Sequence, residues 1–343
     1  MKKVILILSV LILSLSLNSQ TTYISGGSTS YKVIIDNPDD ITPVIIGINP
    51  LVADTWNTNS YMSVGAFMSV NILKYGSVTI DWNKAFFDGI KGSLPITNSS
   101  SGKKIRNHRG LEFSLAYNLL SFKKEKDLQV VLSSELTFSG TRRTSTTTYI
   151  VVPGTAKKMV QLRGGLTNLK TGIDAFDFGT ARFSFNNDTS IKVKDFSAQM
   201  KMNYLYAGIS WHTLNNLVLQ IGESGLSTNC NDYNFFFDML YMPFDLKFPT
   251  VNYSDVFDKN TFPGAAQLNS KMTMKDNSTI RKTGWRLGWE ARKNNIRGAF
   301  TYKVEFGVRP GLKTSKKGIL SPNSYMLLSA GFTFPAGKKY KAV

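Results

Sequence analysis

The chain offers few side chains of the kinds that carry catalysis. It contains two histidines, His108 and His212, and either would act as a general base if a nucleophile lay beside it. Serines precede the first histidine in Ser99-Ser100-Ser101, but the sequence holds no Gly-x-Ser-x-Gly motif. We expect His212 to occupy a tight turn and His108 to lie at the base of a loop. The sequence therefore assigns no catalytic residue, and a hydrolase is only a remote alternative.

Metal chemistry has as little support. Cys230 is the only cysteine, so a zinc site built from several cysteines and histidines is excluded as a first interpretation. We expect no metal and no cofactor. A single cysteine also rules out an intramolecular disulfide. The fold must then be held by the packing of its own side chains or by lipid.

The first twenty residues predict export. Lys2 and Lys3 precede an apolar run from Val4 to Leu17, and polar residues follow it up to Gln20. This order is typical of a secretory signal peptide, so we expect residues 1–19 to be removed. The apolar run is shorter than the roughly 20 residues that a membrane-spanning helix needs. No longer apolar run follows, so a membrane-embedded form of this chain must span with strands.

Alternation of apolar and polar residues is the clearest structural signal in the chain. From Leu111 to Leu119 every odd position is apolar, whereas the even positions are polar or small. Such segments have one apolar and one polar face, as strands at an interface do. Their length of about ten residues exceeds that of typical soluble strands and matches a tilted strand that crosses a bilayer. The same period of two recurs at 62–70, 128–138, 285–290 and 300–309.

The alternating segments come in pairs with short connections inside each pair and long polar stretches between pairs. This arrangement predicts an all-β fold, a closed antiparallel transmembrane β-barrel of about twelve strands, within a range of ten to fourteen. Residues 233–240 are left open as a further strand or part of a folded loop. The expected strands are 43–49, 61–72 with 76–82, 110–121 with 127–139, 158–166 with 177–186, 199–211 with 216–222, 284–291 with 296–309, and 325–334.

With these features the chain resembles the outer-membrane β-barrel proteins of Gram-negative bacteria, over essentially its whole mature length and without pointing to a subfamily. The segment from Met326 to Phe334 is similar to the aromatic-ended last strand that the barrel-insertion machinery reads. The chain departs from that pattern because residues 335–343 follow Phe334. The resemblance implies contact with outer-membrane lipid and lipopolysaccharide. The expected parts are a periplasmic arm at 20–41, the barrel at 42–334 with a long folded loop at 223–283, and a basic periplasmic tail at 335–343.

Ionisable residues on the polar faces would line the interior of such a barrel. A barrel near twelve strands is wider than one that side chains alone fill. Acids and bases alternate along the same strands, so they either pair and partly close the bore or line a narrow water path. Pairing is the interpretation we favour. The predicted pore-lining residues are Arg163, Arg182, Arg286, Glu290, Lys303, Glu305 and Arg309.

Aromatic residues near the ends of the predicted strands favour girdles at the two membrane interfaces. The net charge of +18 favours an anionic partner, and the phosphates of the outer membrane fit better than nucleic acid, for which no motif is present. Most basic clusters fall in the predicted long loops. The predicted girdle members are Tyr61, Trp82, Tyr117, Trp211, Trp285 and Phe334.

Two functions from different classes stay open. The first is a passive channel or transporter for a small solute, anionic or amphipathic. The second is a non-enzymatic barrel subunit that anchors partners in a larger envelope complex through the loop 223–283, which contains Phe235-Phe236-Phe237. An open bore favours the first function, and a sealed bore with an exposed apolar loop favours the second.

Overall fold

The computed structural model describes residues 20–25, 30–40, 43–56, 59–72, 75–88, 108–139, 142–174, 182–185, 189–192, 197–222, 225–244, 273–274, 280–295, 298–312 and 323–336. The predicted signal peptide and most of the predicted tail lie outside these residues. All regular elements within them are β-strands. No helix there is long and apolar enough to cross a membrane.

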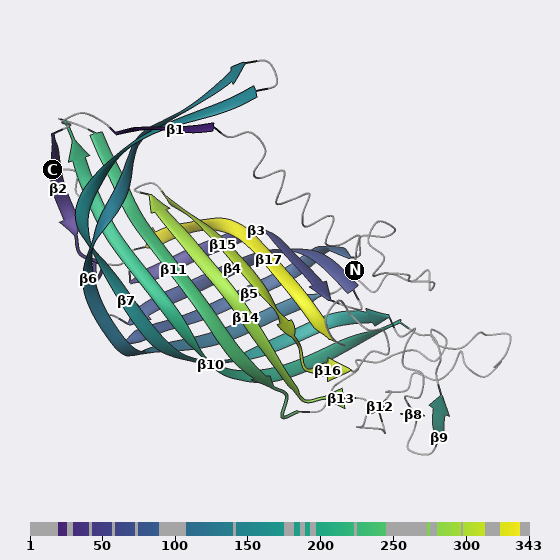
Figure 1. Ribbon diagram of the computed structural model, residues 1–343. Helices are drawn as coiled ribbons and strands as arrows, with labels where there is room; N and C mark the ends of the chain where they lie inside the picture. Colours follow the sequence, from purple (N-terminus) through teal and green to yellow (C-terminus); the bar gives the residue numbers. More distant parts are fainter. Residues whose placement is uncertain are drawn as a thin grey trace.

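Ten antiparallel strands close into a barrel (Figure 1). The ring closes where β17, the last strand, pairs with β3, and where β7 pairs with β10. The predicted all-β fold, a closed antiparallel barrel, is therefore confirmed. In ring order the strands are β3 (Val44–Trp56), β4 (Asn59–Ile72), β5 (Gly76–Asp88), β6 (Arg109–Ser139), β7 (Arg142–Asp174), β10 (Ser197–Ile221), β11 (Gly225–Tyr241), β14 (Thr283–Asn295), β15 (Gly298–Val308) and β17 (Ser324–Ala336).

Alternation along the strands gives the barrel an apolar outer face and a polar interior. On β6, Phe113 and Leu115 are exposed, whereas Glu112 and Ser114 line an interior cavity. This distribution is the reverse of that in a soluble domain and suits a barrel surrounded by lipid. The exposed apolar residues of the outer face include Ile46, Ile48, Val64, Met68, Leu162, Leu166, Leu205, Ile209, Phe237, Met239, Phe300, Phe306, Leu328 and Phe332.

The barrel has fewer and longer strands than the sequence predicts. The expected turns at 122–126 and 212–215 are wrong, because both segments lie inside continuous strands. Lys158 of β7 pairs with Phe122 on one side and with Thr213 on the other. Polar residues occur in these segments because the strands extend beyond the apolar belt, not because the chain turns.

Parts of the predicted loops are also strands. β11 occupies 225–241, so the expected loop 223–283 begins with a barrel strand, and the open question about 233–240 is answered in favour of a strand. The predicted polar stretch 140–157 belongs almost entirely to β7. Of the predicted strand 177–186 the structure describes residues 182–185, which form β8, and β8 lies outside the barrel.

The two ends of the barrel differ. The connections of two or three residues between β4 and β5, β6 and β7, β10 and β11, and β14 and β15 lie at the end where Val44 pairs with Ala336. We call it the short-turn end. At the other, long-loop end, the connections are long except that between β3 and β4. This asymmetry is typical of outer-membrane barrels. Both ends of the barrel chain therefore lie at the short-turn end, as predicted.

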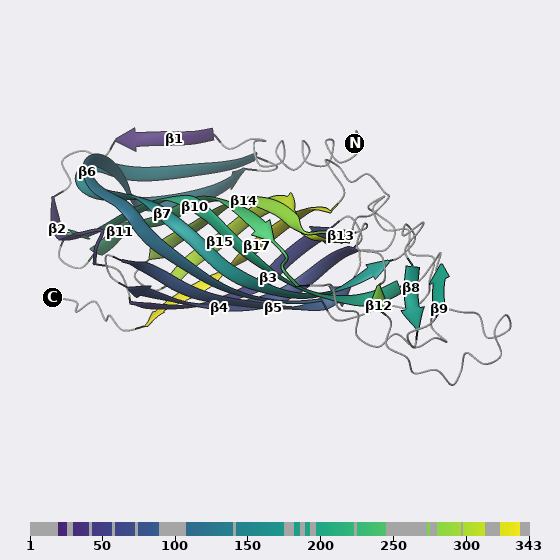
Figure 2. The same ribbon diagram turned by 90° about the horizontal axis from the view of Figure 1, so that it is seen from below.

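The strands β6, β7, β10 and β11 continue past the short-turn end and form an extension with a core of its own (Figures 1 and 2). Ser227 and Asn229 of β11 donate side-chain hydrogen bonds to the carbonyl groups of Val131 and Gln129 on β6, at 2.5 and 2.6 Å. The extension thus bends around until β11 meets β6. Its core consists of Leu128, Val130, Val152, Leu217 and Leu219, with Ile150 and Ile221 packed against it.

An N-terminal segment closes part of the short-turn mouth. β2 (Tyr31–Asp36) pairs with the end of β10, and residues 36–40, which we call the strap, lead from it toward β3. Asn216 donates to the carbonyl groups of Asn37 and Asp40. Asp39 forms ion pairs of 2.7 Å with Lys123 and 2.6 Å with Lys157. The remaining strands are β1 (Gln20–Ser25), which runs parallel to β7, β8 (Arg182–Phe185), β9 (Thr189–Lys192), β12 (Thr273–Met274), β13 (Ile280–Arg281) and β16 (Gly311–Leu312).

Candidate functional site

Two cavities lie one after the other in the barrel. The larger has a volume of about 170 Å³ and reaches the strap, because Pro38 and Asp40 line it. The smaller, of about 50 Å³, lies toward the long-loop end, where His108 and Arg309 line it. The two cavities share five wall residues and therefore meet at one level of the barrel, which we call the junction. The junction residues are Asn49, Asp81, Glu112, Lys303 and Ser329.

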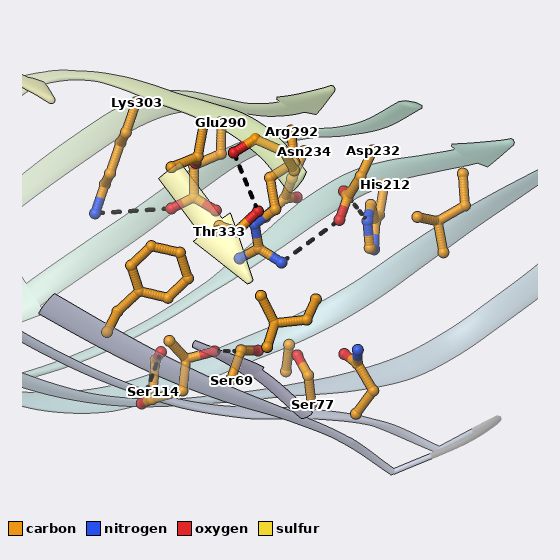
Figure 3. Close-up of a pocket in the computed structure, with 18 of the residues that line it drawn as sticks. Ser69, Ser77, Ser114, His212, Asp232, Asn234, Glu290, Arg292, Lys303 and Thr333 are labelled. Atoms are coloured by element: carbon orange, nitrogen blue, oxygen red, sulfur yellow. Dashed lines mark hydrogen bonds and ion pairs between the residues drawn. The ribbon is translucent and has the colours of Figure 1, made fainter. Parts of the chain in front are cut away.

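The larger cavity has two unlike walls (Figure 3). Ser69, Ser77 and Ser114 project from β4, β5 and β6 on one side, and charged residues of β10, β11, β14 and β15 face them. On the charged side Asp232 accepts from His212 at 2.6 Å and lies 3.5 Å from Arg292. A hydroxyl-rich wall facing paired charges suits water and small polar solutes better than lipid.

A layer of ion pairs crosses the barrel beside the junction. Arg286, 1% exposed, donates to both carboxylate oxygens of Glu112 at 2.8 and 2.9 Å and to Asp238 at 2.8 Å. Its guanidinium lies 4.0 Å from the ring centre of Tyr206. Phe236 fills the same level above Gly288, where a Cβ atom would lie 2.2 Å from the ring. The bidentate geometry fixes the orientation of the arginine at this level of the interior.

Lys303 stands in the junction itself. Its ammonium group lies 3.2 Å from Glu305 and 3.7 Å from Glu290. Figure 3 shows the lysine extended beside Glu290 at the end of the larger cavity. A lysine side chain is flexible and carries a point charge, in contrast to the fixed fork of Arg286. Lys303 is therefore the most movable of the charged groups between the two cavities.

A second layer closes the long-loop side. Arg309 contacts both oxygens of Asp54 at 3.0 and 2.9 Å, and His108 lies 3.5 Å from the same carboxylate. The His108 ring stacks on Tyr61 at 4.2 Å and shares a hydrogen bond of 3.2 Å with Thr171. His108 is thus held from several sides in the wall of the smaller cavity.

The interior above the strap carries an excess of acids, opposite in sign to the chain as a whole. Apart from Lys157, which pairs with Asp39 of the strap, seven carboxylates and five Lys or Arg side chains of the described strands face inward. Each of the five bases forms an ion pair with one of these carboxylates. The acids are Asp54, Asp81, Glu112, Asp232, Asp238, Glu290 and Glu305, and the bases are Arg163, Arg286, Arg292, Lys303 and Arg309.

Asp81 and Asn49 differ from the other polar groups of the junction. Within the described part of the chain, no side chain forms an ion pair or hydrogen bond with the Asp81 carboxylate. Asn49 is 5% exposed, and its side-chain oxygen accepts no hydrogen bond from these residues. Asn49 faces inward in the same alternation as Gly47, and a β-bulge between Asn49 and Val52 inserts one extra residue, so that Val52 also faces inward.

The structure places six of the seven predicted pore-lining residues in the interior. The larger cavity is lined by Arg163, Glu290 and Lys303, and the smaller one by Glu305 and Arg309. Arg286 lies beside the junction, where it binds Glu112. The side chain of Arg182, in β8, lies outside the described residues. The prediction missed Asp54, Asn49, Asp232, Asp238 and Arg292. The alternation along β14 and β11 indicates inward positions for Arg292 and Asp238 once the two strands have the lengths that the structure gives them. No sequence signal indicates the bulge that follows Asn49.

The two histidines lie in strands or beside them. The expected turn at His212 is wrong, because β10 continues through it and the ring faces the larger cavity. Its Nε2 atom lies 2.6 Å from Asp232, while Nδ1 is enclosed without a partner among the described groups. His108 precedes β6 directly and is 2% exposed. Neither ring has a serine hydroxyl as a hydrogen-bond partner among the described residues.

Exposed aromatic rings lie in a row on the outer face toward the short-turn end, in two groups of neighbouring rings. Trp211 lies 5.9 Å from Phe235, Tyr233 lies 6.3 Å from Trp289, and Trp289 lies 5.7 Å from Tyr302. Of the predicted girdle, Tyr117, Trp211 and Phe334 are exposed on this face, and Trp82 and Trp285 are half-buried toward the long-loop end. Tyr61 is a correction. It is 2% exposed inside the barrel, because its odd position puts it on the same face as Ser63 and Phe67.

Comparisons with known proteins add little. No protein family model and no curated protein matches the chain. Among solved structures, it is similar to the outer-membrane expressed OmpT of Vibrio cholerae, with a TM-score of 0.18 and 7% sequence identity, over 88% of this chain and 100% of that chain. A TM-score of this size supports no argument about function. The function must therefore be argued from the geometry of the interior.

Proposed function

We propose that the protein spans a bacterial outer membrane and passes small polar solutes through a narrow, gated path. The observation that supports this function is the meeting of the two cavities at the junction, where only side chains separate them. The exposed apolar belt and the aromatic row support a position of the barrel in lipid. With ten strands the bore is mostly filled, so the path is closed until the junction rearranges.

Conductance of the purified protein in a planar bilayer tests this function. We expect small, discrete conductance steps that Ser329→Trp abolishes, because an indole at the junction would block the contact between the cavities. Ala330→Trp is the matched control, since the adjacent residue faces outward and is exposed. Silence of the unaltered protein, or equal conductance of the two variants, would contradict the proposal.

A second function, the anchoring of a partner protein, has one observation in its favour. The extension projects past the barrel with its own core and presents Leu120 and Phe122 at 62% and 52% exposure. The predicted anchor, the aromatic loop 223–283, is a weaker basis, because Phe235 and Phe237 face outward from β11 within the apolar belt. A silent bilayer together with a protein crosslinked specifically through the extension would favour the anchoring function.

A further inference from the structure

We propose that Asp81 and Asn49 form a binding site for a small monovalent cation at the junction, and that this site makes the path selective for cations. The inference rests on the proposed channel function and adds the class of solute. It runs against the expectation from sequence, where the net charge of +18 and the lining arginines suggested an anionic solute.

The first step concerns the ion pairs of the basic side chains in the interior. Arg286 and Arg309 are each held by carboxylates at about hydrogen-bond distance, and Lys303 lies between two glutamates. An anion entering the path would have to replace one of these carboxylates. Because each base is already neutralised, the positive charges that face the bore provide no site for an anion.

The second step concerns Asp81, the carboxylate of the junction that has no ion pair among the described residues. Asp81 lines both cavities, and within the described strands it lacks the ion pair that every inward-facing base has. A carboxylate in a narrow polar site attracts a cation more strongly than in bulk water, because the surrounding protein screens its charge less. Acidic side chains in the constriction of a pore are the usual means of selecting cations.

The third step is a second oxygen at the junction. Asn49 is nine-tenths buried and lines the same two cavities, and its side-chain oxygen has no donor among the described groups. Ser329 adds a hydroxyl to the same junction. Carboxylate, amide and hydroxyl oxygens are hard ligands that replace part of the hydration shell of an alkali cation. A β-bulge follows Asn49 in β3, and bulges are common next to functional sites.

The reversal potential of the channel in a KCl gradient tests the inference. We expect the unaltered protein to prefer K⁺ over Cl⁻ and Asp81→Asn to lose this preference. Glu125→Gln is the matched control, since it removes one negative charge from an exposed position on the extension and should leave the preference unchanged. Asn49→Ala should keep the sign of the selectivity but lower the conductance for K⁺.

The outcomes separate the inference from the function on which it rests. A silent bilayer contradicts the channel itself. Steady conductance with a preference for Cl⁻, or a K⁺ preference that Asp81→Asn leaves intact, overturns the cation site and keeps the channel. Loss of selectivity in Glu125→Gln as well as in Asp81→Asn also overturns it, because the effect would then come from the overall charge of the protein.

Discussion

Arg286 is the residue on which the central interior depends most. Its side chain is enclosed and makes charged hydrogen bonds to Glu112 and Asp238, which come from β6 and β11, far from β14 in sequence. A buried ion pair contributes little compared with apolar packing, but loss of one partner leaves a buried charge unpaired. The arginine therefore holds three strands at one level of the bore.

We predict that Arg286→Met lowers the free energy of unfolding by about 3–5 kcal/mol. Urea-induced unfolding of the protein in lipid vesicles measures this loss. Adding Glu112→Gln and Asp238→Asn to the variant should recover most of it, because the two carboxylates then no longer need a cation. A loss below about 1 kcal/mol in the single variant would mean that the ion pairs are screened by water, as surface pairs are.

At the scale of single residues, the sequence predicts part of the candidate site. Strand parity places Glu290, Lys303 and Glu305 correctly, because β14 and β15 are regular and pair without a shift. Parity also contradicts the expected girdle position of Tyr61, so that error was avoidable. Asn49 follows the alternation of its strand and was predictable, whereas Asp54 was not, because the bulge after Asn49 breaks the alternation and no local residue pattern specifies where the extra residue is inserted.

At the scale of elements, strand ends are the feature that sequence predicts least well. The polar segment 122–126 is rich in Lys and Glu and looks like a turn, yet it pairs with β7 throughout. A strand that leaves the membrane loses its apolar alternation while it keeps its hydrogen bonds. The alternation of apolar and polar residues therefore predicts the part of each strand that has an apolar face, and it does not predict the extension that continues the strand.

The strap is the element whose attachment depends most on pH. Hydrogen bonds from Lys123 and Lys157 hold the pKa of Asp39 below its usual value of 3.8. A lowered pKa in the attached state means that the two ion pairs stabilise the strap above that value, and that the stabilisation is lost as the pH falls through the pKa of the attached state. The effect is modest because the carboxylate is 43% exposed.

We predict that Asp39→Asn reproduces the acidic state at neutral pH. Residues 31–40 should exchange their amide hydrogens several-fold faster in this variant than in the unaltered protein, as measured by mass spectrometry. Asp127→Asn, at an exposed position of the extension, changes the charge equally and should have no effect on the strap. Equal exchange in all three proteins would show that β2 pairing with β10 is sufficient to hold the segment.

At the scale of the whole molecule, the outer surface decides whether the barrel lies in lipid. The belt is apolar around the ring, and the aromatic row borders it toward the short-turn end. The extension and the strap begin beyond that row, and there charged residues are exposed as well as apolar ones, as in residues 123–127. Such a change over a short distance fits a membrane boundary that crosses the strands near the short-turn end.

We predict that an arginine on the belt destabilises the protein and that one beyond it does not. Phe237→Arg places a charge on the outer face next to Asp238, at the level of the central ion pairs, and should cost about 2–4 kcal/mol of unfolding free energy in vesicles. Val131→Arg is the control, because Val131 is similarly exposed, at 44%, but lies on the extension. Water hydrates the charge of this arginine, so we expect almost no loss of unfolding free energy. Equal losses of unfolding free energy in the two variants would mean that lipid does not surround the belt. This result would contradict the membrane-spanning function.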